Sequence, residues 1–483
     1  MDFNFKTQPY QHQLTALEES WAAPHYALLM EMGTGKTKVA LDTMVKLYEE
    51  NRLEAALVIA PKGVYDNWIK NEIPTHVPDE IEPLILRWQP AQSKKYQDEV
   101  SQFLFDKTGV LKIFVMNVEA FSTPKGTKMA NTFCKRHPDN MVLVDESTTI
   151  KNRKARRTKN IVALNKVSKY RRILTGSPIT KSPMDLFSQC LFLDKKALGF
   201  ENFFAFQARY SILARRVINN RSFQEVTGYR RLDELTEKLE HFSNRVLKKD
   251  CLDLPDKIYM RRNVDLTDEQ VKLYRQMQKL ALAKLQNGEL ATTQSVLTQI
   301  MRLQQICCGF LQPDEGELQP IPSKRMSALR EIVDEADGKV IIWATYRHDI
   351  AKITEMLQKE FGPRSVASYF GDTPQEDRQD IVNRFQDPTS DLRFFVAQPK
   401  TGGYGITLTE ASTVVYYSNS YDLEIRLQSE DRAHRIGQKR AVTYIDLVSP
   451  DTIDEKILKA LRSKINIASE VLNEDTMSWL SES

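Results

Sequence analysis

The segment Gly33-Thr34-Gly35-Lys36-Thr37 combines residue types that could bind a phosphate chain. Its two glycines can adopt backbone conformations that are closed to other residues, which lets main-chain N–H groups approach phosphate oxygens. Lys36 would add a positive charge, and the hydroxyl of Thr37 would be a ligand for Mg²⁺. Because a match this short also occurs in ordinary tight turns, a nucleotide site needs support from the rest of the chain.

A pair of carboxylates, Asp145 and Glu146, follows the apolar run Met141–Val144. An Asp at the end of a buried strand beside a phosphate loop can hold Mg²⁺ through water, and the adjacent Glu can orient and deprotonate an attacking water. A solvated acidic turn is the alternative. It fits poorly, because the apolar run brings both acids to the same sheet edge as the loop.

A pair of arginines, Arg432 and Arg435, lies far along the chain. Their spacing of three residues places them on one face of a turn or helix. Arginines carried by a second domain could close over a triphosphate held by the first and neutralise its charge. The same part of the chain has a glycine-rich segment, Thr401–Gly405, and lacks a second loop that ends in Gly-Lys-Thr.

Apolar runs separated by amphipathic stretches predict the elements that position these residues. Tyr26–Leu29 and Lys38–Leu47 predict a strand before the glycine loop and a helix after it. The other runs suit strands that are buried on both faces of a parallel sheet, and each ends in a polar or glycine-containing loop. In the first half these runs are Leu57–Ala60, Pro83–Leu86, Lys112–Met116, Met141–Val144 and Arg172–Leu174. In the second half they are Gly338–Thr345, Ser365–Phe370, Arg393–Ala397, Val414–Tyr417 and Thr443–Val448.

Composition limits the class of protein. A chain of 483 residues is too long for one core, and its 41% hydrophobic and 27% charged residues are typical of a soluble globular protein. No run approaches the about 18 apolar residues of a membrane helix, and no secretory signal is recognisable, so a reducing compartment is expected. Five scattered cysteines without a Cys-Xaa-Xaa-Cys pair indicate structural thiols.

Local charge is more informative than the net charge of +4. A basic segment runs from Lys151 to Lys159, and further basic residues follow up to Arg172. Either it is an ordinary solvated face or it contacts a DNA backbone beside the nucleotide site. Gln11 poses a similar choice, because it could read an adenine edge or be a surface residue at a helix start.

The order of motifs resembles the Swi/Snf (Snf-two) family of superfamily-two helicase-like DNA translocases. The most specific piece is Asp431–Gln438, which is nearly the family's motif VI. The other matching segments, in chain order, are Pro9–Gln11, Glu31–Thr37, Ala60-Pro61 with Asn67-Trp68, Asp145-Glu146 with Ile150–Asn152, Leu174–Pro178, and Thr401–Thr409. The resemblance implies an α/β fold with two RecA-like parallel-sheet lobes in tandem and a helical insertion, or protrusion, from each.

The resemblance implies five segments. These are an ATP-binding lobe at 1–182, a helical protrusion at 183–254, a linker and second protrusion at 255–322, a second lobe at 323–466 and a C-terminal helix or tail at 467–483. The aromatic residues of the first protrusion are expected to form a small core of its own.

The resemblance also implies roles for site residues, with ATP and Mg²⁺ bound. Lys36, Asp145, Glu146, Arg432 and Arg435 would act in catalysis, and Thr37 and Asp145 would hold the metal. The nucleotide would contact Gln11, Gly33, Thr34, Gly35, Lys36, Thr37, Gly405 and Gln428. DNA would contact Pro61, Lys62, Lys151, Asn152 and Arg153 on the first lobe and Thr401, Gly402 and Gly403 on the second.

Two positions depart from the family pattern. Motif II usually continues to a His that contacts motif III and helps link hydrolysis to DNA movement, whereas this chain has Ser147-Thr148. We expect the Thr148 hydroxyl, which can donate and accept, to substitute in part. Met30 stands where the family usually has an acidic residue, and the sequence offers no physical account of it.

The expected function is a DNA-dependent ATPase that moves along double-stranded DNA as a monomer. It would act in a bacterial or viral-host cytoplasm, or in a nucleus if eukaryotic. A strand-separating helicase would need a wedge or accessory domain, for which no surplus segment is obvious. A catalytically weakened regulator is suggested only by Thr148 and Met30. The intact catalytic candidates argue against it, namely Lys36, Asp145, Glu146, Arg432 and Arg435.

Overall fold

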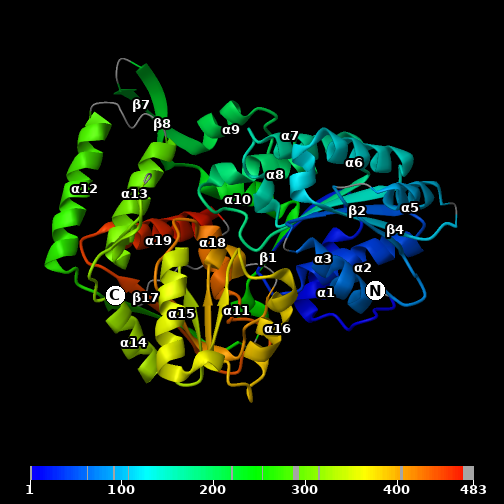
Figure 1. Ribbon diagram of the computed structural model, residues 1–483. Coiled ribbons are helices and arrows are strands. Elements are labelled where there is room, and N and C mark those ends of the chain that lie inside the picture. The colour runs from blue at the N-terminus through cyan, green and yellow to red at the C-terminus, as the bar shows by residue number, and fades with distance from the viewer. Residues whose placement is uncertain are drawn as a thin grey trace. The chain divides into compact units, whose positions relative to one another are not determined.

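The computed structural model describes residues 3–62, 64–90, 93–106, 108–218, 221–252, 254–286, 293–313, 316–402 and 406–471. The chain forms two compact units (Figure 1). The first comprises residues 1–216, 222–253 and 466–479, and the second is built mainly from residues 254–465. Each has its own parallel sheet with helices on both faces, which confirms the predicted pair of RecA-like α/β lobes.

The first unit contains a seven-stranded sheet in the order β3-β4-β2-β5-β6-β1-β9, in which every neighbouring pair is parallel. Most of its strands are buried along their length, as the apolar runs predict. The strands are β1 (His25–Met30), β2 (Ala55–Ala60), β3 (Leu84–Arg87), β4 (Lys112–Asn117), β5 (Asn140–Asp145), β6 (Tyr170–Leu174) and β9 (Ser243–Val246).

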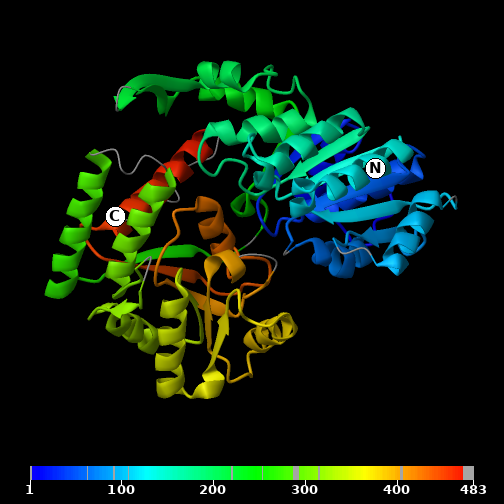
Figure 2. The same ribbon diagram turned by 45° about the horizontal axis from the view of Figure 1, so that its top comes forward.

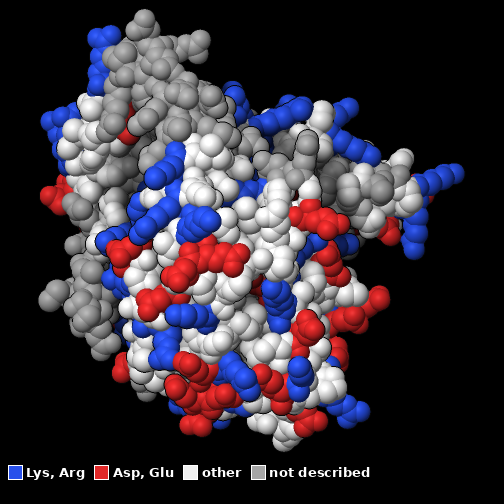
Figure 3. Space-filling view, turned by 60° about the vertical axis from the view of Figure 1, so that its left-hand side comes forward, with Lys and Arg blue, Asp and Glu red and all other residues white. Residues whose placement is uncertain are grey.

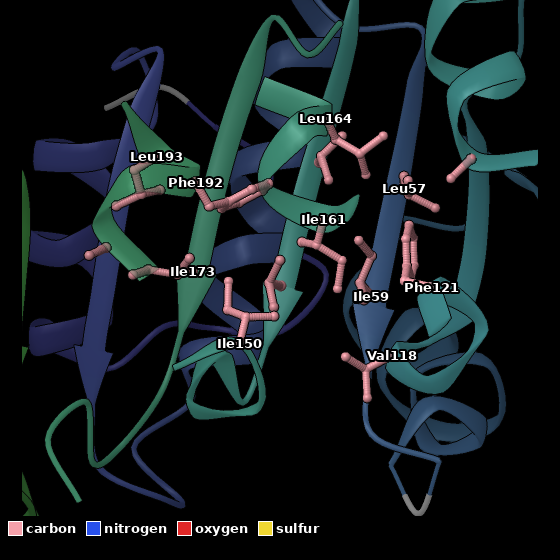
Figure 4. Close-up of a cluster of buried hydrophobic side chains, with 14 of the residues drawn as sticks. Leu57, Ile59, Val118, Phe121, Ile150, Ile161, Leu164, Ile173, Phe192 and Leu193 are labelled. Carbon is pink, nitrogen blue, oxygen red and sulfur yellow. The ribbon is translucent and has the colours of Figure 1, made fainter. Parts of the chain in front are cut away.

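Helices cover both faces of this sheet, so alternate strand residues enter two separate cores. Figure 4 shows one core, where Ile161 and Leu164 face Leu57 and Ile59 of β2. The helices are α1 (Gln11–Ser20), α2 (Lys36–Glu49), α3 (Tyr65–Asn67), α4 (Ile73–His76), α5 (Lys94–Phe105), α6 (Pro124–Arg136), α7 (Arg156–Ala163), α8 (Leu186–Leu193), α9 (Phe203–Tyr210), α10 (Leu232–Glu240) and α11 (Lys248–Cys251). Shorter turns are the π-helical η1 (Trp68–Glu72) and the 3₁₀ turns η2 (Val118–Ser122), η3 (Ser147–Ile150), η4 (Leu164–Lys166) and η5 (Pro183–Asp185).

The segment expected to be a helical protrusion, 183–254, differs in two ways. It contains a two-stranded ribbon of β7 (Ser211–Ile218) and β8 (Arg221–Tyr229), and its strand β9 completes the lobe sheet by pairing with β1. Strand β9 is four residues long and largely polar, so it gives no apolar run. The expected separate aromatic core is wrong. Phe206 and Tyr210 are fully buried, but they belong to the same cluster as Ile173 of the lobe sheet, and Phe204 is exposed.

The second unit contains a six-stranded parallel sheet in the order β10-β17-β16-β13-β15-β14. Its strands are β10 (Lys257–Asn263), β13 (Lys339–Trp343), β14 (Val366–Tyr369), β15 (Phe394–Ala397), β16 (Ala411–Tyr416) and β17 (Val442–Val448). Strand β10 comes from the segment expected to be linker and protrusion. The sheet of this lobe therefore begins well before residue 323.

The helices of the second unit include a pair, α12 (Asp268–Gln286) and α13 (Thr293–Cys308), that packs together through Tyr274 and Leu303 (Figure 2). This pair agrees with the helical pattern expected there. The others are α14 (Arg325–Glu335), α15 (Arg347–Phe361), α16 (Gln375–Gln386), α17 (Pro399–Gly402), α18 (Leu423–Glu430) and the part of α19 (Ile453–Val471) up to residue 465. A 3₁₀ turn η6 (Pro363–Ser365) and a small ribbon of β11 (Phe310–Leu311) and β12 (Gln319–Pro320) complete the unit.

Surface charge and thiols agree with the compositional expectations. On the face in Figure 3, basic and acidic side chains are intermixed. All five cysteines lie in the described part of the chain and are free thiols, and all but Cys251 are buried. Within the described residues no helix has the length and apolarity needed to span a membrane.

Candidate nucleotide and DNA site

The glycine loop joins β1 to α2 in the first unit, as predicted. Gly33 and Gly35 have φ values of 83° and 87°, in the left-handed region that favours glycine. Gly35 is the N-cap of α2, and among the described residues no side chain caps it. The amides of the first helical turn are therefore available to an anion, which is the arrangement that a phosphate group requires.

Helix α1 supports the loop through Gln13. The buried Gln13 side chain donates from Nε2 to the Thr34 carbonyl over 3.1 Å and accepts from the Tyr10 amide over 3.0 Å. A ring nitrogen of His12 lies 2.8 Å from the same Thr34 carbonyl. Gln11, the residue singled out from the sequence, is exposed at the start of the helix. The third position of a helix is where a capping glutamine acts, and this signal could have identified Gln13.

The loop lysine and the second carboxylate meet in the structure. Lys36 Nζ lies 3.7 Å from Glu146 Oε1, and each side chain is 9% exposed. Because β1 and β5 are separated only by β6, their carboxyl ends share one edge of the sheet. The structure thus brings together the residues predicted to bind phosphate and to activate water.

Both oxygens of Asp145 have donors. Oδ2 accepts from the Trp68 indole and Oδ1 from the Glu146 amide, each over 2.9 Å. Glu146 itself has a φ of 47°, which is uncommon for a residue with a side chain. Such strained conformations gather at functional sites, where the surrounding structure holds them.

Two further segments hold the loop. A Cβ atom at Gly176 would lie 3.1 Å from the Met32 amide nitrogen, so the segment after β6 packs directly on the loop. Arg245 in β9 donates over 2.9 Å to the carbonyls of both Leu29 and Gly176. The Lys248 amide donates to Glu31 Oε2 over 2.7 Å. Sequence reasoning missed Arg245 and Lys248, because they belong to no phosphate motif.

The residues expected to contact DNA on this lobe follow the neighbouring strands β2 and β5. Pro61 is buried, Lys62 and Asn152 are exposed, and Lys151 and Arg153 are half-buried. The Arg153 guanidinium stacks 3.9 Å from the centre of the Phe203 ring.

One part of the basic segment is structural. Arg172 is fully buried, and its guanidinium donates to the carbonyls of Ser20 and Ala23 over 2.7 and 2.8 Å. Burial lowers the pKa of Arg172 to about 9. Arg171 likewise donates to the Asn165 carbonyl over 2.9 Å. Arg171 and Arg172 of β6 therefore serve the fold, and only the basic residues before β6 remain candidates for DNA contact. The basic run considered from the sequence extended further, to Arg172.

In the second unit, Arg432 and Arg435 both approach the Ile406 carbonyl. Arg432 is 2% exposed and donates to Ile406 over 3.1 Å and to the Gln428 carbonyl over 2.9 Å. Arg435 is half-buried, and its distance to Ile406 is 3.5 Å. Gln428 is buried, and its Oε1 lacks a hydrogen-bond partner among the described residues.

An ionic cluster that sequence reasoning missed holds α18, the helix that precedes these arginines. Arg426 donates to Glu430 over 2.7 Å and to Asp446 over 2.5 Å. Of the glycine-rich segment, Thr401 and Gly402 end α17, and a Cβ atom at Gly402 would lie 2.8 Å from the Trp343 ring. Gly403 and Gly405 lie outside the described residues.

A phosphate loop beside a carboxylate pair, on a chain with two RecA-like lobes, is typical of helicase-like ATPases. Residues 16–310 match the model of the SNF2-related domain, and residues 324–437 match that of the helicase conserved C-terminal domain. The first match alone covers more than half of the chain, and the chain therefore belongs to the SNF2-related family.

Several named proteins are similar to this chain. YwqA of Bacillus subtilis, provisionally named an ATP-dependent helicase/translocase, is 26% identical over 99% of this chain and 50% of its own length. The TATA-binding protein-associated factor MOT1 of Saccharomyces cerevisiae is 28% identical over 69% of this chain and 20% of its own length. The chain thus spans half, or less, of these relatives. The solved structure of a Sulfolobus solfataricus SWI2/SNF2 ATPase core in complex with dsDNA is 24% identical, with a TM-score of 0.44, and covers 99% of this chain and 96% of its own.

Proposed function

We propose that this chain is a DNA-dependent ATPase that translocates on double-stranded DNA by opening and closing its two lobes. The proposal rests chiefly on Lys36 and Glu146, which lie 3.7 Å apart beside an uncapped helix N-terminus. Family membership supports the same reaction, and the relative YwqA is provisionally named an ATP-dependent helicase/translocase.

The residues of the first lobe fit a nucleotide and a metal ion. The α2 amides and Lys36 would hold the β- and γ-phosphates, and Thr37 and Asp145 would hold Mg²⁺. When bound, Mg²⁺ neutralises charge on the phosphate oxygens. Glu146 would orient the attacking water and take its proton. Mg²⁺ sites typically have only one or two protein ligands, and phosphate oxygens and water molecules complete the coordination shell.

The second lobe would complete the site when the lobes close. Arg435 would neutralise charge on the γ-phosphate, and Arg432 would hold the Ile406 carbonyl and orient this arginine pair. The buried Gln428 Oε1 still has acceptor capacity among the described residues, which supports its proposed contact with the nucleotide.

Duplex DNA would lie against phosphate-binding groups at the same sheet edge. Lys62 and Lys151–Arg153 follow β2 and β5, whose carboxyl ends are adjacent. Thr401–Gly403 would add contacts on the second lobe. We further propose a monomer that acts in a bacterial or viral-host cytoplasm, or in a nucleus.

ATP hydrolysis by the purified chain, measured with duplex DNA, single-stranded DNA, RNA or no nucleic acid, tests the proposal. We expect duplex DNA to raise kcat most, by about tenfold or more, a coupling of about 1.4 kcal/mol. Glu146→Gln is the catalytic control. Displacement of a third strand from a triplex, without separation of a plain duplex, would identify translocation. Equal rates under all conditions would overturn the DNA dependence, and duplex separation would indicate a strand-separating helicase.

A further inference from the structure

The first turn of α8 joins two segments of the nucleotide site that are distant in sequence. Asp185, Ser188 and Gln189, which we call the α8 bridge, are 8%, 1% and 0% exposed. They contact the segment after the carboxylates and the segment after β6. One turn further along the helix, Phe192 and Leu193 fix α8 to the lobe core, where they pack near Ile173 of β6 (Figure 4).

Gln189 is the centre of the bridge. Its Nε2 donates over 2.8 Å to the carbonyls of Pro178 and Asp185, and its Oε1 accepts from the Ser147 hydroxyl over 2.6 Å. Two carbonyl acceptors fix the orientation of the amide, because only the NH₂ end can donate to them. Ser147 must therefore be the donor of the third bond. In a fully buried site each lost partner costs about 1–3 kcal/mol, so the arrangement is well determined.

The other members of the bridge extend it toward the proposed DNA contacts. The Ser188 hydroxyl contacts the carbonyls of Ile150 and Lys151 over 2.7 and 2.9 Å. Asp185 Oδ2 accepts from the Thr180 amide over 3.0 Å, and the Lys151 ammonium donates to the Thr180 hydroxyl over 2.7 Å. A shift of Lys151 would therefore act on α8 and on the segment after β6 together.

We propose that the α8 bridge, through Gln189, couples DNA contact at Lys151–Arg153 to the catalytic carboxylates. Ser147 directly follows Glu146, whose backbone is held in the left-handed region. A change in the Ser147–Gln189 bond would alter the placement of the Glu146 carboxylate. Gln189 is thus a positioning residue. It links the carboxylates to the segment after β6. This link is additional to the contact expected of Thr148. This inference rests on the proposed function.

The test compares the ratio of kcat with and without duplex DNA in Gln189→Leu, Ser147→Ala and the double variant. We expect each single variant to lower the ratio about fivefold or more, with KM for ATP and Kd for DNA changed by less than about threefold. The double variant should be no worse than the more affected single variant, because both remove the same bond. Ser147→Ala deletes only a hydroxyl. This variant therefore still measures the effect of the Ser147–Gln189 bond on the kcat ratio if Gln189→Leu folds poorly.

Asn140→Leu is the matched control. Asn140 is also a fully buried amide that donates to three carbonyls, but it lies at the opposite end of β5 from Asp145. It should lower stability and leave the ratio unchanged. A wild-type ratio in the bridge variants, or an equal loss in Asn140→Leu, would overturn the bridge alone. A wild-type chain without DNA stimulation would overturn the proposed function as well.

Discussion

The indole Nε1 of Trp68 donates a 2.9 Å hydrogen bond to Oδ2 of Asp145. Trp68 is 1% exposed and begins the π-helical turn η1, a form of helix that is often found at functional sites. The Glu146 amide occupies the other carboxylate oxygen. Two donors thus fix the orientation of the Asp145 carboxylate. One of them, the Trp68 indole, can be removed by substitution.

Replacing Trp68 should therefore impair use of the metal. In Trp68→Phe the carboxylate loses its indole donor, and we expect kcat to fall about tenfold with weaker apparent Mg²⁺ affinity, as for other partners of metal ligands. A magnesium titration of ATPase activity measures both. Trp88→Phe, at a residue that is 3% exposed in the other core, is the control. Equal activity of the two variants would exclude the orienting role.

Gly35 tests the shape of the phosphate loop. An alanine there would adopt an unfavourable φ of 87° and place its Cβ atom 2.1 Å from Gln13 Nε2, so we expect ATP binding to be lost. Gly109 has a similar φ of 80°, with nothing within 4 Å in the described part of the chain. Gly109→Ala should therefore cost only the backbone strain of about 1–2 kcal/mol. Calorimetric titration with ATP compares them, and tight binding by Gly35→Ala would contradict the assignment.

The two glutamines of α1 should have different effects. Gln13→Leu removes the bonds to the Thr34 carbonyl and the Tyr10 amide, so we expect KM to rise about tenfold for ATP and GTP alike. Gln11→Leu tests the proposed adenine contact and should reduce only the preference for ATP over GTP. Steady-state kinetics with both nucleotides decides between them. An unchanged preference in Gln11→Leu would make that residue a surface position.

Substitutions of Arg432 and Arg435 should affect different quantities, the first mainly stability and the second mainly turnover. Arg435→Ala is expected to lower kcat about 10³-fold while ATP binding and Tm stay close to wild type. Arg432→Ala removes a buried guanidinium and should destabilise the second lobe by about 2 kcal/mol or more. Thermal unfolding and ATPase rates measure the two effects. Normal turnover in Arg435→Ala would reject lobe closure as the catalytic step.

Asp349 in α15 predicts a pH-dependent stability. Burial raises the pKa of Asp349 to about 7, and its Oδ2 lacks a partner among the described residues. The native state then retains a proton that the unfolded chain releases near its ordinary pKa of 3.8, so stability falls as pH rises from about 4 to 7. Asp349→Asn removes this loss and should be more stable by about 4 kcal/mol at pH 8, with little difference at pH 4. Urea unfolding followed by tryptophan fluorescence at both pH values tests this, and a pH-independent difference between wild type and variant would contradict it.

The sequence predicts the central strands and the edge strands β3 and β14, but it misses the edge strands β9 and β10 for a physical reason. Strands β2 and β5 are buried on both faces and therefore appear as apolar runs. Strands β9 and β10 lie at sheet edges and carry polar side chains, so no such run marks them. Because β9 and β10 were missed, the first lobe was expected to end at residue 182 and the second to begin at residue 323.

The same contrast holds at the site. Lys36 and Glu146 could be found because phosphate and water chemistry require those residue types at fixed places in a motif. Other residues of the site donate hydrogen bonds to backbone carbonyls, namely Gln13, Arg245 and Gln189. Every residue has such a carbonyl, so no sequence motif marks these contacts. Only the folded structure shows which carbonyl each one reaches.

Strand β9 affects how the first lobe can be divided. It pairs with β1 on the side opposite β6, and residues 175–242 separate it from β6 in the sequence. A fragment cut after residue 182 would leave the outer edge of β1 unpaired and would lose Arg245. An open, apolar strand edge recruits other chains, so such a fragment would be prone to self-association even though every phosphate-loop residue is present.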